Sequence, residues 1–182
     1  MISEIKNAID KTLQGLAYWI AYKKELSNID LIEADIVSEA AHFLSARLSN
    51  YFVKKEVDYS TLNSSLPKQY ADLGIYSREN GKCNCIIEFK LGNSTNGGYK
   101  HDVQKINNLK KLETDITCLV IIAYKDSCTI KVPKSLVTPD GKAKRGMVKN
   151  VKGVNVKVRR VCNALASKKV TKMKKVVCLE VI

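Results

Sequence analysis

Apolar residues recur along this chain with two periods, and these periods predict where helices and strands lie. Spacings of three and four residues predict three helices, over residues 3–26, 30–49 and 100–112. Alternating or nearly continuous apolar runs predict four strands, over residues 51–59, 70–76, 83–91 and 116–124. The last run is apolar almost throughout, so we expect it to form a central strand that is covered on both faces.

Turn and cap signals divide these segments. Asn80-Gly81 predicts a hairpin turn between the second and third strands. Asp30, followed three residues later by Glu33, predicts a capping box at the start of the second helix. Beyond Pro133 the pattern predicts a turn, a strand, a short helix and a closing strand, at residues 139–141, 154–161, 160–167 and 176–182.

Charged residues interrupt two of the predicted strands. Asp72 lies in Tyr-Ala-Asp-Leu-Gly-Ile, and Glu88 and Lys90 lie in Ile-Ile-Glu-Phe-Lys-Leu. Side chains two apart in a strand point to the same face, so Glu88 and Lys90 project together while Phe89 points the other way. Buried charges are costly unless they are well paired or coordinate an ion. The arrangement therefore predicts a divalent metal ion held by Asp72 and Glu88, with Lys90 beside it.

The register of the predicted hairpin decides whether Asp72 can reach Glu88. A two-residue Asn80-Gly81 loop would set Asp72 opposite Phe89, so that Asp72 and Glu88 would point to opposite faces. A shared metal site therefore requires an odd-length loop, a β-bulge, or a bend where the strand that holds Asp72 begins.

Asp72 and the Glu88-Phe89-Lys90 triplet resemble the motif of the PD-(D/E)xK nuclease superfamily. The resemblance covers about residues 28–125, where one predicted helix precedes the strands and another follows them. It implies an α/β fold with a restriction-endonuclease-like core, in which helices flank a mixed central β-sheet built in the order α-β-β-β-α-β. Ala71 replaces the family's proline, which shapes the strand and is not a ligand.

The resemblance also implies the chemistry of the site. Asp72, Glu88 and the backbone carbonyl of Phe89 would bind Mg²⁺ or Mn²⁺, since such ions prefer oxygen ligands. Lys90 would orient the attacking water or stabilise the negative charge that develops on the phosphoryl group.

Three residues on the flanking helices complete the expected site. Glu39 stands where many relatives carry a further catalytic glutamate, although a solvated surface glutamate would fit the same pattern. Gln104, with Lys105 beside it, would contact the scissile phosphate or form part of a polar helix surface. His42 corresponds to a metal ligand of the viral cap-snatching endonucleases, or is a packed or exposed histidine.

The net charge of +13 is concentrated near one end of the chain. Residues 1–130 hold 16 basic and 16 acidic side chains, whereas residues 131–182 hold 15 basic and 2 acidic ones. A one-sided basic region is typical of a protein that binds a polyanion. The candidates for phosphate contacts are Lys142, Lys144, Arg145, Lys149, Lys152, Lys157, Arg159 and Arg160.

These features predict a single nuclease domain in three parts: an N-terminal helix (1–27), a catalytic core (28–125) and a basic C-terminal part (126–182). The predicted activity is metal-dependent hydrolysis of phosphodiester bonds in DNA, of restriction or recombination type. Cutting both strands of a duplex would require a homodimer. Two alternatives remain: an RNA endonuclease of viral type, and a noncatalytic nucleic-acid-binding module.

Apolar runs and cysteines indicate the compartment. The most apolar early run is too short to cross a membrane and no secretory signal is recognisable, so we expect a protein of the cytoplasm, or of the nucleus or host-cell interior if it is viral. Cys83 and Cys85, two apart in a predicted strand, should face the same side. The six cysteines lack zinc-ligand spacing, and we expect small buried apolar residues in a reducing compartment.

Overall fold

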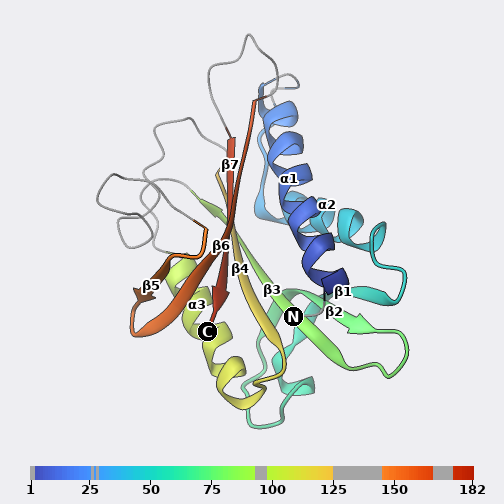
Figure 1. The fold of residues 1–182 in the computed structure, drawn as a ribbon, viewed down its shortest axis with the longest axis vertical. Coiled ribbons are helices and arrows are strands. Elements are labelled where there is room, and N and C mark those ends of the chain that lie inside the picture. Colours follow the sequence, from blue (N-terminus) through green and yellow to red (C-terminus); the bar gives the residue numbers. More distant parts are fainter. Residues whose placement is uncertain (1–2, 26, 28, 93–97, 125–144, 166–173) are drawn as a thin grey trace.

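A computed structural model describes residues 3–25, 27, 29–92, 98–124, 145–165 and 174–182. These residues form helices and strands, and Figure 1 shows them in one compact arrangement around a sheet. The elements are α1 (Ser3–Glu25), α2 (Glu33–Ser45), β1 (Tyr51–Asp58), the 3-10 helix η1 (Tyr59–Thr61), β2 (Tyr70–Ser77), β3 (Cys83–Gly92), α3 (Tyr99–Leu112), β4 (Thr117–Tyr124), β5 (Val148–Val151), β6 (Val154–Ala164) and β7 (Lys174–Val181).

All the helices and strands predicted up to residue 124 are confirmed, but the predicted start of α2 is wrong. The helix begins at Glu33, and Ile32 is its N-cap residue. The Asp35 carboxylate accepts a hydrogen bond from the Ile32 backbone N–H at 2.9 Å. Asp35 is therefore the residue whose side chain bonds back to the N-cap backbone. Asp30 and Glu33 therefore do not form a capping box, and the Glu33 side chain is left for another contact.

The C-terminal part departs further from the prediction. The predicted short helix over 160–167 is wrong at its start, because β6 continues as a strand to Ala164. Cys162 pairs with Val176 of β7 and is buried, so cross-strand pairing decides the conformation here. Strand β5 is not predicted at all. The predicted turn at 139–141 and residues 166–167 lie outside the described residues.

One mixed sheet holds all seven described strands, in the order β1-β2-β3-β4-β7-β6-β5. Strands β3 and β4 pair in parallel, and every other neighbouring pair is antiparallel. A parallel pair needs a crossover connection, and α3 supplies it between β3 and β4. The expected α/β class, with helices flanking a mixed central sheet, is confirmed. The basic C-terminal part is not a separate layer, because β5, β6 and β7 complete the same sheet.

Two hydrophobic cores lie on the two faces of the sheet. Helices α1 and α2 cover one face, and α3 covers the other (Figure 1). The central strand β4 is buried along its whole length: Leu119 and Ile121 belong to the core under α1 and α2, and Val120 and Ile122 belong to the core under α3. The expectation that this strand is covered on both faces is confirmed.

Within the described residues, no helix is long and apolar enough to cross a membrane.

Candidate active site

Strands β2 and β3 have the register that brings Asp72 level with Glu88. Leu73 pairs with Ile87, and a β-bulge between Ile75 and Tyr76 shifts the pairing by one residue toward the turn. Continued by one residue, this register sets Asp72 opposite Glu88 instead of Phe89. The bulge is one of the three solutions that the sequence required.

The backbone pairing between β2 and β3 ends at Ile87, and beyond this residue β3 makes side-chain contacts instead. The Phe89 backbone N–H donates to the Asp72 Oδ2 at 2.6 Å, and the Leu91 N–H donates to the Glu33 Oε2 at 2.9 Å. Alternate N–H groups of a strand point to the same edge, so both carboxylates face the edge of β3 that β2 has left. The candidate site lies at this opening, where β2, β3 and the start of α2 meet.

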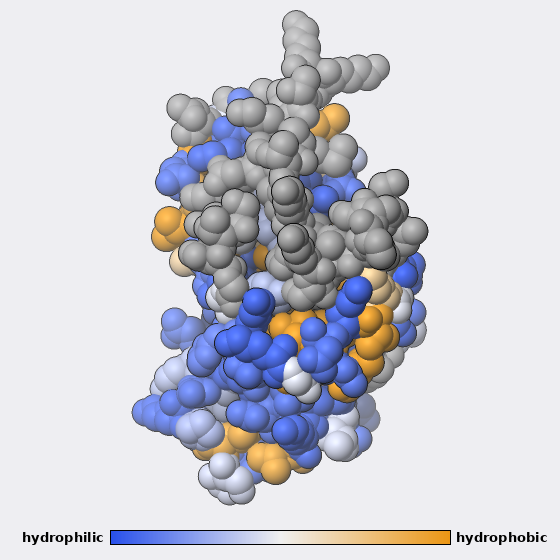
Figure 2. Space-filling view, turned by 90° about the vertical axis from the view of Figure 1, so that its left-hand side faces the viewer, coloured by the Kyte–Doolittle hydropathy of each residue, from blue (hydrophilic) through white to orange (hydrophobic). Residues whose placement is uncertain are grey.

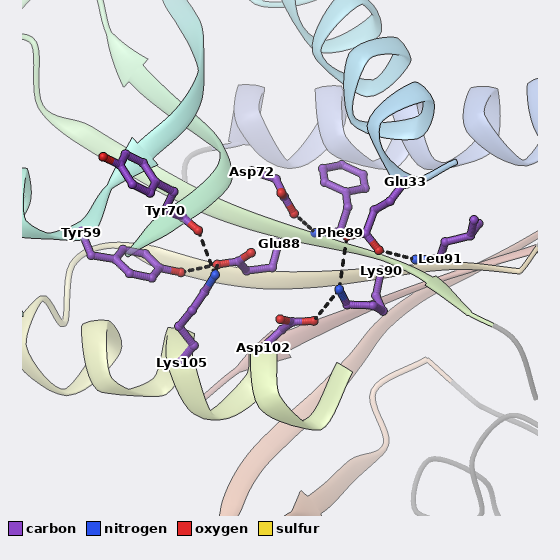
Figure 3. A network of polar contacts seen from close by, with 10 residues as sticks. All are labelled: Glu33, Tyr59, Tyr70, Asp72, Glu88, Phe89, Lys90, Leu91, Asp102 and Lys105. Atoms are coloured by element: carbon purple, nitrogen blue, oxygen red, sulfur yellow. Dashed lines mark hydrogen bonds and ion pairs between the residues drawn. The ribbon is translucent and has the colours of Figure 1, made fainter. Parts of the chain in front are cut away.

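Lys90 is held between two acids from different helices. Its ammonium Nζ lies 3.2 Å from Glu33 Oε1 of α2 and 3.6 Å from Asp102 Oδ2 of α3 (Figure 3). Burial alone would lower the pKa of Lys90, but the charges of Asp102 and Glu33 outweigh it and raise the pKa. Lys90 is therefore a fixed cation, and its position depends on both helices.

Glu88 is the most deeply buried acid of the site, with 3 % of its surface exposed. Its Oε1 accepts a hydrogen bond from the Tyr59 hydroxyl at 2.5 Å and lies 2.7 Å from the Lys105 ammonium. Lys105 also donates to the Tyr70 backbone carbonyl at 2.8 Å. Burial raises the pKa of Glu88 to about 7, although Lys105 and Tyr59 act in the opposite direction. Near neutral pH this carboxyl is poised between its two protonation states.

The cluster carries more acid than base. Four carboxyl groups, from Glu33, Asp72, Glu88 and Asp102, surround two lysines, so the fully ionised cluster has two unbalanced negative charges. Burial raises the pKa of Asp72 and of Asp102 as well as that of Glu88. Asp102 Oδ2 is buried and has no hydrogen-bond donor among the described residues. A cluster with these properties favours an added cation.

Asp72 and Glu88 leave one oxygen each for such a cation. Asp72 Oδ1 and Glu88 Oε2 take part in no hydrogen bond of the described residues, whereas their other oxygens are engaged. No three histidine, cysteine or acidic side chains of the described part are gathered around one metal position. Mg²⁺ is commonly held by one or two carboxylates and several waters, so two open carboxylate oxygens and a nearby backbone carbonyl suit it.

A hollow of about 400 Å³ adjoins Asp72 and is lined also by Glu56, Tyr70 and Ala71. Glu56 has a positive φ of 52°. In the register of β1 and β2 it falls between two paired positions and level with Asp72. The strands are therefore distorted beside the candidate site, and the hollow gives Asp72 contact with the surface.

Two sequence-predicted residues on the helices make no hydrogen bond or ion pair with this cluster within the described residues. Glu39 makes none of the described hydrogen bonds or ion pairs, and α2 instead contributes Glu33, six residues earlier. Gln104 is exposed, because a step of one residue turns it about 100° around α3 from Lys105. The helix residues that contact the strands of the site are therefore Glu33, Asp102 and Lys105, and the roles expected for Glu39 and Gln104 stay predictions.

His42 and the cysteines do not join the cluster. His42 is exposed, and its ring centroid lies 6.3 Å from that of Phe43, so it is a surface residue; a role as a metal ligand stays a prediction. Cys83 and Cys85 belong to the cores on opposite faces, so the prediction that they face the same side is wrong. The bulge in the β2–β3 pairing displaces the alternation between them. All five described cysteines are free and buried, as expected.

The predicted phosphate-binding residues fall into two groups. Arg145, Lys152 and Lys157 are exposed and Lys149 is half-buried, whereas Lys142 and Lys144 lie outside the described residues. The buried Arg159 side chain lies 3.4 Å from Asp10 and 3.9 Å from Glu180, and Arg160 also pairs with Asp10, at 3.4 Å. Arg159 and Arg160 therefore pair with Asp10 and hold β6 against α1, and their expected contact with phosphate stays a prediction.

Sequence reasoning missed three members of the cluster: Glu33, Tyr59 and Asp102. One signal was present for Asp102, because it precedes Lys105 by three residues and shares its helix face. Glu33 was expected to be part of a cap, and Tyr59 was expected to end a strand but instead begins η1. Both reach the cluster only through tertiary packing.

Comparison of the chain with protein-family models, with curated proteins and with solved structures gave no match.

Proposed function

We propose that this protein is a metal-dependent endonuclease that hydrolyses phosphodiester bonds in DNA. The observation that carries the proposal is the convergence of Asp72, Glu88 and Lys90 where β2 separates from β3 (Figure 3). A binding module has no need for three partly buried carboxyls with raised pKa values around two lysines.

The element order supports a restriction-endonuclease-like core. From α2 to β4 the chain runs helix, three antiparallel strands, helix and parallel strand, apart from the short η1. This is the α-β-β-β-α-β order that the PD-(D/E)xK resemblance implies. The acid and the Glu-x-Lys triplet lie on the second and third strands of this unit, on either side of the opening.

Asp72, Glu88 and the Phe89 carbonyl would hold Mg²⁺ or Mn²⁺ in this site. Such an ion supplies a water of lowered pKa and withdraws charge from the phosphoryl oxygen. The two open carboxylate oxygens and the excess negative charge of the cluster support this assignment. Because Glu88 is partly protonated near pH 7, it must release a proton before both of its oxygens can act as acceptors.

The lysines would act on the substrate. Lys90, held by Glu33 and Asp102, would orient the attacking water and stabilise the negative charge that develops on phosphorus. Lys105 holds Glu88 in place together with Tyr59. The attack of water on phosphorus breaks the bond to the leaving oxygen, and that oxygen takes up a proton.

Nucleic acid would be gripped by the exposed basic residues of the C-terminal part. Viewed from the side of α3 and β5, the described surface is largely hydrophilic, with a few apolar patches (Figure 2). Phosphate contacts contribute affinity without sequence information. DNA is the proposed substrate, and cutting both of its strands would require a homodimer.

The decisive experiment measures cleavage of supercoiled plasmid, linear duplex and single-stranded RNA with Mg²⁺, Mn²⁺ or EDTA. Asp72→Asn, Glu88→Gln and Lys90→Met should each lower the cleavage rate by about a hundredfold or more and leave binding intact. Glu79→Gln and Lys82→Met, on the exposed hairpin turn, are matched controls. Cleavage in EDTA, or near-wild-type rates for two of the three site variants, would contradict the assignment. Cleavage of RNA alone would favour the RNA endonuclease.

A further inference from the structure

A second hollow lies at the other side of the sheet, between the first turns of α1 and the strands β6 and β7. Its volume is about 380 Å³, which is within the range of small-ligand sites. The side chains that line it are mainly basic: Lys6, Arg145, Lys157 and Arg159, with Gly146, Val158 and the single acid Glu180.

Arg159 is the buried cation among the residues that line this hollow. Its side chain is 10 % exposed, and its Nε–H is a buried donor without a hydrogen-bond partner among the described residues. One guanidinium nitrogen of Arg159 lies 3.4 Å from Asp10, and its other terminal nitrogen lies 3.9 Å from Glu180. Asp10 also pairs with Arg160. Buried donors of native proteins normally have an acceptor, and this Nε–H has none within the described residues.

Three further cations of the hollow have no acidic partner. Lys6, Arg145 and Lys157 are exposed and make no ion pair or hydrogen bond within the described part of the chain. Lys157 pairs in register with Glu180 across β6 and β7, yet the two side chains form no ion pair. Four cations and one acid leave three positive charges, and adding Asp10 and Arg160 leaves that excess unchanged.

The hollow is separate from the catalytic cluster. Glu88, Val120, Leu179 and Val158 form one row across β3, β4, β7 and β6. Glu88 contacts α3, whereas Arg159, beside Val158, contacts Asp10 of α1, and α1 and α3 cover opposite faces of the sheet (Figure 1). A ligand held by Arg159 therefore lies on the opposite face from Glu88 and does not compete for the catalytic residues.

We propose that this hollow binds a phosphate group, with Arg159 as the buried anchor and with Lys6, Arg145 and Lys157 around it. A phosphate carries up to two negative charges and several acceptor oxygens, so it suits clustered arginine and lysine donors and the unpartnered Nε–H. The group is either a free anion or part of a nucleic acid. This binding does not depend on the proposed cleavage.

Titration of the protein with inorganic phosphate tests the proposal. The Arg159 Nε–H resonance, followed by ¹⁵N NMR, should shift in a saturable way. Lys157→Gln and Lys6→Gln should each weaken binding by about tenfold, as expected for one lost charge-assisted contact. Lys11→Gln is the matched control, because Lys11 is exposed on the same helix but does not line the hollow.

Single-stranded oligonucleotides distinguish the sources of the phosphate. With the Glu88→Gln variant, which leaves the oligonucleotide intact, a 5′-phosphorylated strand is compared with its 5′-hydroxyl counterpart. Tighter binding of the phosphorylated strand that Lys157→Gln abolishes would identify a terminal phosphate, and equal weakening of both strands would identify internal phosphates. The proposal is overturned if the Arg159 resonance stays fixed with every ligand, or if Lys157→Gln and Lys6→Gln bind as Lys11→Gln does.

Discussion

Glu33 and Lys90 are 57 residues apart in the chain, yet their side chains meet at 3.2 Å beside the opening between β2 and β3. Glu33 uses both carboxylate oxygens, one for the Lys90 ammonium and one for the Leu91 backbone N–H. The start of α2 is thereby fixed to the edge of β3, and Lys90 is given a defined position.

This relationship makes Glu33, not Glu39, the glutamate of α2 that matters for activity. Glu33→Gln keeps one acceptor oxygen and loses the charge, so it cannot hold both partners. We expect the cleavage rate to fall about tenfold or more, the effect of losing one hydrogen bond to a charged group. Glu39→Gln should cleave at nearly the wild-type rate, and equal rates for the two variants would show that the contact is structural only.

The protonation of Glu88 should control the acid side of the pH–rate profile. Because Glu88 must ionise with a pKa of about 7, the wild-type rate should fall about tenfold per unit below pH 7. Lys105 and Tyr59 lower this pKa, so Lys105→Met and Tyr59→Phe should raise it and move the acid limb to higher pH.

The control for this prediction is Tyr70→Phe, because only the backbone carbonyl of Tyr70 contacts Lys105. Its acid limb should coincide with that of the wild type. A Tyr59→Phe profile that also coincides with the wild type would show that Glu88 is not the titrating group.

Glu88 should also make stability depend on pH in an unusual direction. Its folded pKa of about 7 lies above the ordinary 4.5, so between these values the folded state binds more protons than the unfolded state. The free energy of unfolding should therefore fall as pH rises from 4.5 to 7, by at most about 3 kcal/mol. Urea unfolding in EDTA at several pH values should show that Glu88→Gln removes this loss of stability. An identical pH dependence of the free energy of unfolding in the wild type and in Glu88→Gln would refute the prediction.

A buried ion pair far from the site gives a prediction about stability alone. Lys174 is 2 % exposed, and its Nζ lies 2.5 Å from Glu25 Oε1. Glu25→Gln leaves a buried ammonium without its counter-charge and should lower the free energy of unfolding by about 3–5 kcal/mol. Asp115→Asn breaks the exposed pair with Lys82 and should cost less than about 1 kcal/mol. Similar losses in the two variants, measured by urea unfolding, would contradict the buried pairing.

The amino-acid sequence by itself determined most helices and strands, and also the common direction of Glu88 and Lys90. Both depend on the backbone geometry of one segment, in which alternate strand residues share a face. Both side chains contact α3 while Phe89 packs in the opposite core, as that geometry requires. The charged residues of the strands could therefore be found without a structure.

Tertiary structure alone decided which partners these residues have. A bulge set Asp72 level with Glu88, and no local pattern encodes its position. The rotation of α2 and α3 about their axes brought Glu33 and Lys105 to the cluster and left Gln104 exposed, because packing against the sheet selects the inward face. In the same way, the charge pattern of the C-terminal part showed an excess of basic residues, but only the packing of α1 against β6 placed Arg159 beside Asp10 and largely buried its side chain.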